Sequence, residues 1–135
     1  MKPPTTSTRI LRLLFWETTV RCNLACAHCR RLESNEADVG DLLTSQAEAL
    51  IEQLAELGRR QPPPMPVLVF SGGEPLCRPD LFHLVGQARR SGLIAALATN
   101  GTMIDAARAR QVRDSGIARV SVSLDGATAD VHDRM

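Results

Sequence analysis

The chain has 135 residues and a formal net charge of +1, long enough for one domain with a hydrophobic core. A charge this close to neutral excludes the electrostatic footprint of a nucleic-acid or anionic-membrane binder, and the scarcity of aromatic residues argues against a base-stacking platform. No apolar run approaches the roughly 18 residues that span a bilayer. We therefore expect a cytoplasmic protein, in which clustered cysteines indicate metal or redox chemistry rather than disulfides.

The first expected element is a strand over residues 11–20, which are apolar and rich in β-branched and aromatic types. It follows a polar tail, residues 1–10, and leads into a cysteine-containing segment. Residues 31–40 are polar and are expected to form a loop. Ser45 and Glu48 then have the spacing of a capping box, and apolar residues recur at helical intervals up to Gly58.

Three further strands are expected over residues 67–70, 93–98 and 119–124. Two helices separate them: the first is expected to begin at Pro79 and to end at Gly92, and the second to occupy residues 105–115. Strands that alternate with helices predict an α/β fold with a parallel sheet and right-handed crossovers.

The core domain is expected to span residues 11–135 and to contain about four βα units. No fourth helix is indicated after the last strand, and a sheet of four parallel strands would leave unpaired edges. We therefore expect the domain to be truncated at its C-terminal end.

The most informative segment contains three cysteines, Cys22, Cys26 and Cys29, in the spacing C-x3-C-x2-C. Iron–sulfur clusters are normally held by four cysteine thiolates, so a cluster with four irons bound here would keep one iron open. An open coordination position is what separates a catalytic metal site from a closed structural one. The triplet therefore predicts a reactive metal site.

Other unusual residues follow the remaining expected strands. Gly72-Gly73-Glu74-Pro75 comes directly after the second strand, Asn100 after the third, and Ser123 with Asp125 after the fourth. In parallel α/β folds the loops at the carboxyl ends of the strands build the site. We therefore expect these residues and the cysteines to meet in one site.

The cysteine triplet, the Gly-Gly-Glu-Pro run and the later Ser-Leu-Asp-Gly run together resemble the radical S-adenosylmethionine (SAM) enzymes. This resemblance implies the N-terminal portion of a partial (βα)6 barrel that holds a [4Fe-4S] cluster and binds SAM at the open iron. It also implies a reducing partner such as flavodoxin or ferredoxin. The SAM is cleaved reductively, and the resulting radical abstracts hydrogen from a small-molecule substrate.

The resemblance also implies roles for individual residues. Cys22, Cys26 and Cys29 match the cluster ligands, and His28 matches a position near the adenine of SAM. Gly72, Gly73 and Glu74 match the segment that binds the methionyl ammonium group. Ser123 matches a polar position near the ribose or carboxylate, and Asn100 is a candidate for the same neighbourhood. A side chain at Gly73 is expected to weaken SAM binding and to spare the cluster.

A narrower resemblance rests on Trp16-Glu17-Thr18-Thr19, Arg21-Cys22-Asn23-Leu24 and His28-Cys29-Arg30. These segments resemble the radical SAM enzymes of alternative haem and haem d1 biosynthesis, which modify tetrapyrrole side chains. Peptide-maturing radical SAM enzymes share much of the pattern, so they remain an alternative.

Other interpretations of the cysteines stay open. With His28, the triplet could be a zinc site in a non-catalytic cysteine-rich metal-binding module, although adjacent His28 and Cys29 rarely chelate one tetrahedral ion. Cys77 could be a fourth ligand, but a lone cysteine is more often a small buried hydrophobic residue, which is the interpretation we favour. Trp16 is expected in the core, and His83 and His132 are expected at the surface, with His132 the nearer of the two to the site.

Overall fold

The structure is a computed structural model that describes residues 10–29 and 40–135. The strands are β1 (Leu13–Glu17), β2 (Val67–Ser71), β3 (Ile94–Thr99) and β4 (Arg119–Val122), and the helices are α2 (Thr44–Arg59), the 3-10 helix η2 (Pro75–Cys77), α3 (Leu81–Arg90), α4 (Ala106–Ser115) and α5 (Ala129–His132). Apart from Ile10 and Gly40, the expected tail over 1–10 and the expected loop over 31–40 lie outside the described residues.

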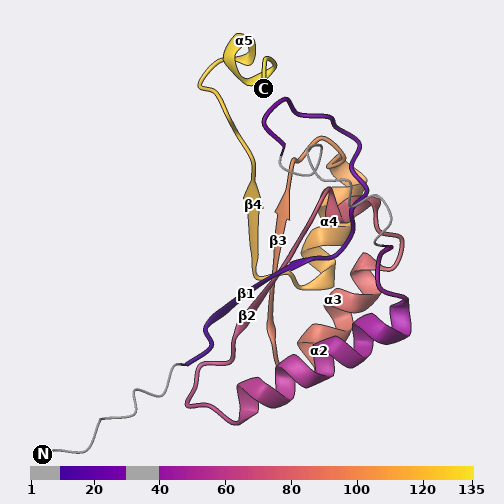
Figure 1. Ribbon diagram of the computed structural model, residues 1–135, viewed down its shortest axis with the longest axis vertical. Helices are drawn as coiled ribbons and strands as arrows, with labels where there is room; N and C mark the ends of the chain where they lie inside the picture. Colours follow the sequence, from indigo (N-terminus) through magenta and orange to yellow (C-terminus); the bar gives the residue numbers. More distant parts are fainter. Residues whose placement is uncertain (1–9, 30–39) are drawn as a thin grey trace, which may run out of the picture.

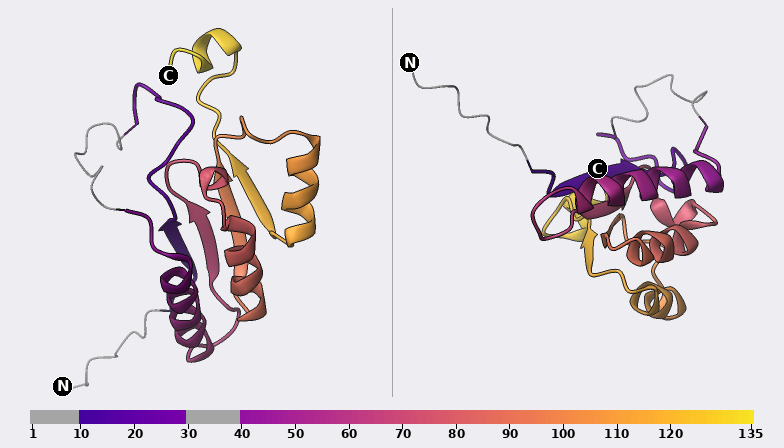
Figure 2. Two further views of the ribbon diagram at one scale, coloured as in Figure 1. Left: turned by 90° about the vertical axis from the view of Figure 1, so that its right-hand side faces the viewer. Right: turned by 90° about the horizontal axis from the view of Figure 1, so that it is seen from below.

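The four strands form one parallel sheet in the order β1-β2-β3-β4, so each strand pairs with its neighbours in the sequence (Figure 1). Helices α2, α3 and α4 connect successive strands and lie on one face of the sheet (Figure 2). The predicted α/β architecture with parallel strands is confirmed. Because all four strands run in the same direction, their carboxyl ends meet at one edge of the sheet.

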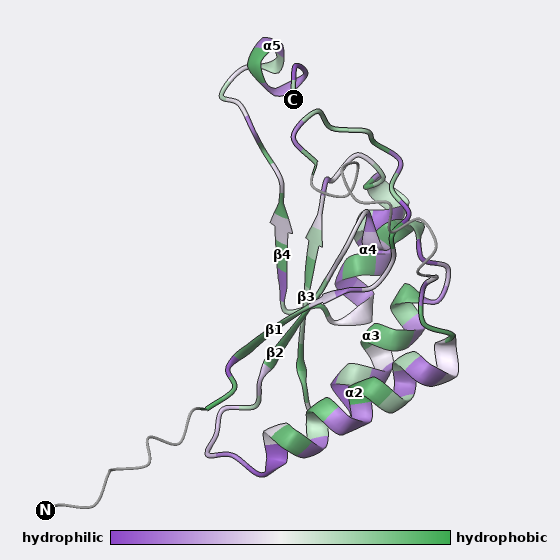
Figure 3. Cartoon of the chain, in the orientation of Figure 1, coloured by the Kyte–Doolittle hydropathy of each residue, from purple (hydrophilic) through white to green (hydrophobic). Residues whose placement is uncertain are grey.

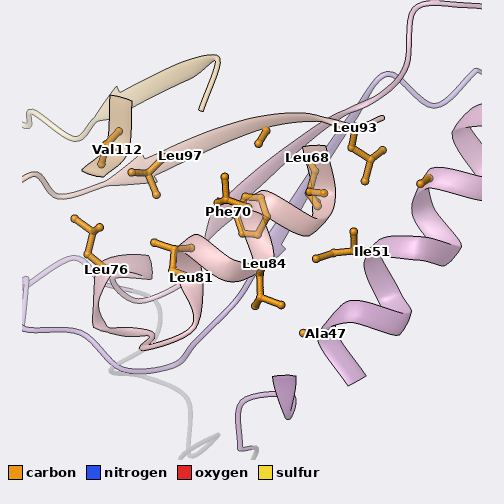
Figure 4. Packing of buried hydrophobic residues seen from close by; sticks show 14 residues of the cluster. Ala47, Ile51, Leu68, Phe70, Leu76, Leu81, Leu84, Leu93, Leu97 and Val112 are labelled. Carbon is orange, nitrogen blue, oxygen red and sulfur yellow. The ribbon is translucent and has the colours of Figure 1, made fainter. Parts of the chain in front are cut away.

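The hydrophobic core lies between the sheet and helices α2 and α3 (Figure 4). Leu68 and Phe70 point from β2 into this layer, and they meet Ile51 of α2 and Leu84 of α3, all with no exposed surface. Strands β1, β2 and β3 are apolar along most of their length, whereas α2 and α3 mix apolar with polar residues (Figure 3). A strand in a parallel sheet has this composition because both of its faces are normally covered.

The first strand alternates between the two faces of the sheet. Leu14 and Trp16 pack against the core, and the Trp16 ring lies 5.7 Å from the Phe70 ring between centroids. The expectation that Trp16 belongs to the core is therefore confirmed. Leu13 and Phe15 point the opposite way and are 51% and 67% exposed. The helix-free face of the sheet is thus open at this strand.

Several element boundaries differ from the sequence prediction. Helix α2 begins at Thr44, and the side chain of Gln46 accepts a hydrogen bond from the Leu43 backbone N–H (2.9 Å), so the expected capping box of Ser45 and Glu48 is wrong. Leu42 and Thr44 are held by Arg78 and Asp80, which fixes the start of the helix earlier than the sequence suggests.

Helix α3 likewise begins at Leu81, after Asp80, rather than at Pro79. A one-turn helix, α5, follows β4 where the sequence analysis predicted none. The predicted start of α4 agrees with the structure, since the Asp105 carboxylate accepts the Arg108 N–H (2.7 Å) and Gly116 ends the helix with φ +76°. None of the helices in the described part of the chain is long and apolar enough to cross a membrane.

Candidate functional site

A cavity of about 640 Å³ lies where the strands end, and residues that follow all four strands line it. Such a volume falls within the range of small-molecule and cofactor sites, about 300–1,000 Å³. Of the residues predicted from the sequence, the cavity brings together Cys22, Cys26, Cys29, His28, Gly72, Gly73, Asn100 and Ser123. Glu74 is not among the lining residues. His132, which was expected at the surface but nearer to the site than His83, also lines the cavity.

The segment that leads to the cysteines, residues 18–21, pairs with the glycine-rich segment after β2. The Thr18 N–H donates to Ser71 O, the Gly73 N–H to Thr19 O, and the Glu74 N–H to Arg21 O, each over 2.8 Å. These bonds continue the β1–β2 pairing beyond the ends of both strands. We call residues 18–21 the stem of the cysteine loop, because they place Cys22 beside the glycines.

The two glycines are required by this close approach within the chain. A Cβ on Gly72, whose φ is +128°, would lie 2.5 Å from Thr19 O. A Cβ on Gly73 would overlap Arg21 O and would lie 2.8 Å from the Arg21 carbonyl carbon. A side chain at Gly73 would therefore first displace the stem, so we now expect it to disturb the cysteine loop as well as the SAM side of the cavity.

Glu74 is completely buried, and its carboxylate has three hydrogen-bond donors. Oε1 accepts from the Leu76 N–H (3.0 Å) and from Thr99 Oγ1 (2.8 Å), and Oε2 accepts from the Asn100 N–H (2.8 Å). A buried carboxylate needs such partners to offset its lost hydration. Glu74 thus ties the glycine-rich segment to the end of β3.

Asp41 holds the stem from the other side, and the sequence analysis did not single it out. Its carboxylate accepts hydrogen bonds from Thr19 Oγ1 (2.7 Å), the Val20 N–H (3.0 Å) and the Arg21 guanidinium (3.0 Å). Burial acts to raise the pKa of this carboxyl, but the hydrogen bonds from Thr19, Val20 and Arg21 together hold the pKa below its ordinary value of 3.8. Asp41 therefore stabilises the stem in its ionised form.

Arg78 was also missed, and it is a buried cation at the base of the site. Its side chain is 3% exposed and donates to Thr18 O (2.7 Å), Leu42 O (2.9 Å) and Asp80 Oδ2 (3.0 Å). Its Nε lies 2.7 Å from Asp80 Oδ1 without hydrogen-bonding geometry, so that contact is an ion pair only. The guanidinium also lies over the Trp16 ring, 5.8 Å from its centroid.

Asp41 and Arg78 connect the stem, which follows β1, to the segment just before α2. Asp41 and Leu42 bring the returning chain back against the stem, so the segment that carries the cysteines is closed at its base. In the sequence, the run Arg78-Pro79-Asp80 has the composition of an ordinary helix start and carries no sign of this contact.

The end of the chain, residues 125–135, contributes to the lining of the cavity. The Asp125 N–H donates to His132 Nδ1 (3.1 Å), and the backbone N–H of Ala27 donates to Met135 O. Helix α5 therefore lies beyond the carboxyl ends of the strands, on the same side as the cysteine loop (Figure 1). His132 and Asp133 line the cavity from this segment.

Cys77 lies outside the cavity lining. Its Sγ lies 3.6 Å from Met103 Sδ, and burial raises the pKa of the thiol. A partly buried thiol with a raised pKa behaves as a small apolar side chain, because the thiolate is the form that binds metals. The position agrees with the interpretation that Cys77 is not a ligand.

The three cysteines of the site form a donor set that suits an iron–sulfur cluster. No three His, Cys, Asp or Glu side chains within residues 10–29 and 40–135 are placed to hold one ion, as a zinc site would require. A cluster of four irons does not require three side chains around one ion, because each thiolate binds a different iron. Cys22, Cys26 and Cys29 are all free and partly exposed at one cavity, which suits such a group.

The profile of the Radical SAM superfamily matches residues 16–135, so the chain belongs to this superfamily. It is 42% identical over 122 residues to an AdoMet-dependent heme synthase of Methanosarcina barkeri, a match that covers 90% of this chain and 33% of the relative. It is 40% identical over 114 residues to a pre-heme d1 synthase of Dinoroseobacter shibae, covering 84% of this chain and 27% of the relative.

A third relative is named for a different function. The chain is 40% identical over 120 residues to the mycofactocin maturase MftC of Mycobacterium ulcerans, covering 89% of this chain and 31% of the relative. The chain thus spans about a third of the length of each of these proteins.

Among solved structures, BtrN in complex with AdoMet and 2-DOIA superposes on the chain with a TM-score of 0.73. The two are 23% identical, and the match covers 94% of this chain and 52% of BtrN. At this identity the likeness concerns the fold. It confirms the predicted fold class, in which four parallel strands with helices form part of a radical SAM barrel.

Proposed function

We propose that the chain holds a [4Fe-4S] cluster through Cys22, Cys26 and Cys29 and binds SAM in the same cavity, as the core of a radical SAM enzyme. The observation that carries this proposal is the convergence of the three free thiols and the glycine-rich segment on one cavity. The cavity has room for a cofactor beside the thiols, and a cluster bound by only three thiolates keeps one iron for SAM.

The chain's own residues would bind SAM and orient it. Gly72 and Gly73 present a backbone edge without side chains to the cavity, where the methionyl end of SAM would lie. His28 and Ser123 line the same cavity and would contact the adenine and the ribose or carboxylate. Glu74 supports this edge from beneath, since its three hydrogen bonds hold the glycine-rich segment against β3.

When bound, the cluster and SAM supply an electron and an adenosyl radical that removes a hydrogen atom from the substrate. The chain contributes by excluding water from this cavity. His132 and Asp133 line one part of it and the cysteine loop another, and the Asp125 N–H holds His132 at its margin. Exclusion of water prevents the side reactions of a reactive intermediate.

We propose a tetrapyrrole as the substrate, modified at a side chain during haem biosynthesis. The support is the identity to the heme synthase and to the pre-heme d1 synthase. The identity to a mycofactocin maturase supports a second candidate, a peptide substrate. Each match covers only about a third of the relative, so it supports these candidates through the shared core alone.

The proposed cluster also has consequences for the electron donor and for the cellular compartment. A cluster that must be reduced needs an electron donor such as flavodoxin or ferredoxin, and free thiols are kept reduced in the cytoplasm, where we place the protein. Residues 11–135 would then act as one core domain, with neither nucleic acid nor membrane as a partner.

Anaerobic reconstitution with iron and sulfide tests the cluster. We expect about four irons and four sulfides per chain, because three thiolates hold a four-iron cluster with one iron open. We also expect an EPR signal that changes when SAM is added. Cys26→Ala should abolish the cluster, whereas Cys77→Ala, which removes a thiol outside the cavity, is the matched control. Bound zinc without labile sulfide would instead support the metal-binding module.

Product analysis tests the substrate. An iron porphyrin with propionate side chains is incubated with SAM and a low-potential reductant, and loss of mass from the porphyrin is measured with formation of 5′-deoxyadenosine. Product from the porphyrin supports the tetrapyrrole proposal. Cleavage of SAM without any change in the porphyrin would favour the peptide alternative.

A further inference from the structure

Asn100, the first residue after β3, has every polar group of its side chain directed by a neighbour. Its Oδ1 accepts hydrogen bonds from the Thr102 backbone N–H (2.9 Å) and from Thr102 Oγ1 (2.7 Å). Its Nδ2 donates to Asn23 Oδ1 (3.0 Å). Asn23, which follows Cys22 directly, donates from its own Nδ2 to Thr102 Oγ1 (2.8 Å).

These contacts decide which way the Asn100 amide faces. A backbone N–H can only donate, so the atom that faces the Thr102 N–H must be the oxygen of Asn100. The NH₂ group consequently faces the cysteine loop. Asn100, Asn23 and Thr102 form a closed ring of hydrogen bonds, and this ring prevents the amide from turning over.

The NH₂ group has two protons, and only one is used by Asn23. The Asn100 nitrogen also lies 3.9 Å from Cys22 Sγ, a long contact that a large, polarizable sulfur still accepts. The Leu24 backbone N–H points at the same sulfur over 3.4 Å. The sulfur of Cys22 therefore faces two N–H groups, one from its own loop and one from the residue that follows β3.

We infer that Asn100 is a positioning residue that donates a hydrogen bond to the Cys22 thiolate of the bound cluster and raises the cluster's reduction potential. Reduction adds negative charge to the cluster and its sulfur ligands, and an N–H directed at a sulfur stabilises that charge. This inference rests on the proposed cluster. It assigns Asn100 to the cluster side of the cavity rather than to SAM.

The test measures the midpoint potential of the reconstituted cluster by EPR-monitored titration, without SAM. Asn100→Leu removes the donor without adding charge. We expect its reduced-to-oxidised ratio at a fixed potential to fall by about threefold to tenfold, and a tenfold change corresponds to about 59 mV for a one-electron couple. Asn100→Asp, which keeps an acceptor for the Thr102 N–H, should shift the potential in the same direction.

Thr102→Ala is the matched control. It opens the ring by removing the hydroxyl, but it keeps the backbone N–H that orients the Asn100 amide. Its potential should stay close to that of the unaltered protein. A shift as large as that of Asn100→Leu would mean that loop rigidity, not the N–H donor, sets the potential, and the inference would be overturned.

Other outcomes distinguish a failure of the role of Asn100 from a failure of the proposed cluster. If the cluster forms and responds to SAM but Asn100→Leu and Asn100→Asp keep the original potential, the role of Asn100 is refuted and the proposed function stands. Weaker SAM binding by these variants at an unchanged potential would place Asn100 with SAM and would also refute the inference. If no four-iron cluster forms in the unaltered protein, the proposed function itself fails.

Discussion

Replacement of Gly73 by alanine is the sharpest test of how the site is built. Real Cβ atoms essentially never approach other heavy atoms within 3.0 Å, yet a Cβ here would lie closer than that to both Arg21 O and the Arg21 carbonyl carbon. Because these are backbone atoms, no side-chain rotation relieves the overlap. The stem must move away from the glycine-rich segment.

The cost of this movement can be estimated from the contacts that are lost. The hydrogen bonds from Gly73 N–H to Thr19 O and from Glu74 N–H to Arg21 O each contribute about 0.5–1.5 kcal/mol. Forcing an extra methyl group into a packed site costs about 1–3 kcal/mol. The sum, about 2–6 kcal/mol, is below the 5–15 kcal/mol of a typical domain at all but the upper end. We expect the fold to persist while the stem is displaced.

Displacement of the stem moves Cys22, which follows Arg21 directly, relative to Cys26 and Cys29. We therefore expect Gly73→Ala to bind less than half the iron and sulfide of the unaltered chain after anaerobic reconstitution, while circular dichroism shows a folded chain with a lowered Tm. Gly40→Ala is the control, since a Cβ there meets nothing within 4 Å. Full iron content with an unchanged Tm in Gly73→Ala would refute the reasoning.

Three other predictions concern side chains around the site. Arg78→Met should lower the free energy of unfolding by about 3–5 kcal/mol, because it leaves Asp80 and two carbonyl groups without their buried cation; a loss under 1 kcal/mol in denaturant unfolding would contradict this. Cys77→Ala should keep the iron content of the unaltered chain, and loss of most of the iron would make Cys77 a ligand. The pKa of Asp41 is lowered from its ordinary value of 3.8, so the ionised carboxylate stabilises the fold at pH values above 3.8. This contribution is lost as the pH falls below 3.8 and the carboxylate becomes protonated. Asp41→Asn should therefore flatten the acid side of a plot of Tm against pH for the metal-free chain, and an unchanged slope would count against the contact.

Much of the fold could be predicted because the pattern is local. The apolar run of β2 and the helical spacing that ends at Gly58 depend on residues close together in the sequence. Helix ends were predicted less well. Thr44 and Asp80, at the starts of α2 and α3, hydrogen-bond to each other across 36 residues, so no local pattern shows where those helices begin.

The candidate site also has features that local sequence patterns reveal and contacts that they do not. The cysteines, the glycines and the strand-end positions of Asn100 and Ser123 could be found from spacing and from the rule that parallel strands place their carboxyl ends together. Glu74 was found, but its place beneath the cavity was not, because that depends on Thr99 and the Asn100 backbone.

The amino-acid sequence alone reveals which groups this protein has for chemistry: three thiols in one short segment, glycines after a buried strand, and an alternation that produces a parallel sheet. What those groups touch depends on the folded chain. The tertiary structure shows that the glycines admit the stem of the cysteine loop, that Arg78 and Asp41 close that loop, and that the Asn100 amide faces Cys22. Backbone periodicity is set by neighbouring residues, whereas the hydrogen bonds of these charged and amide side chains join residues 20 to 78 positions apart.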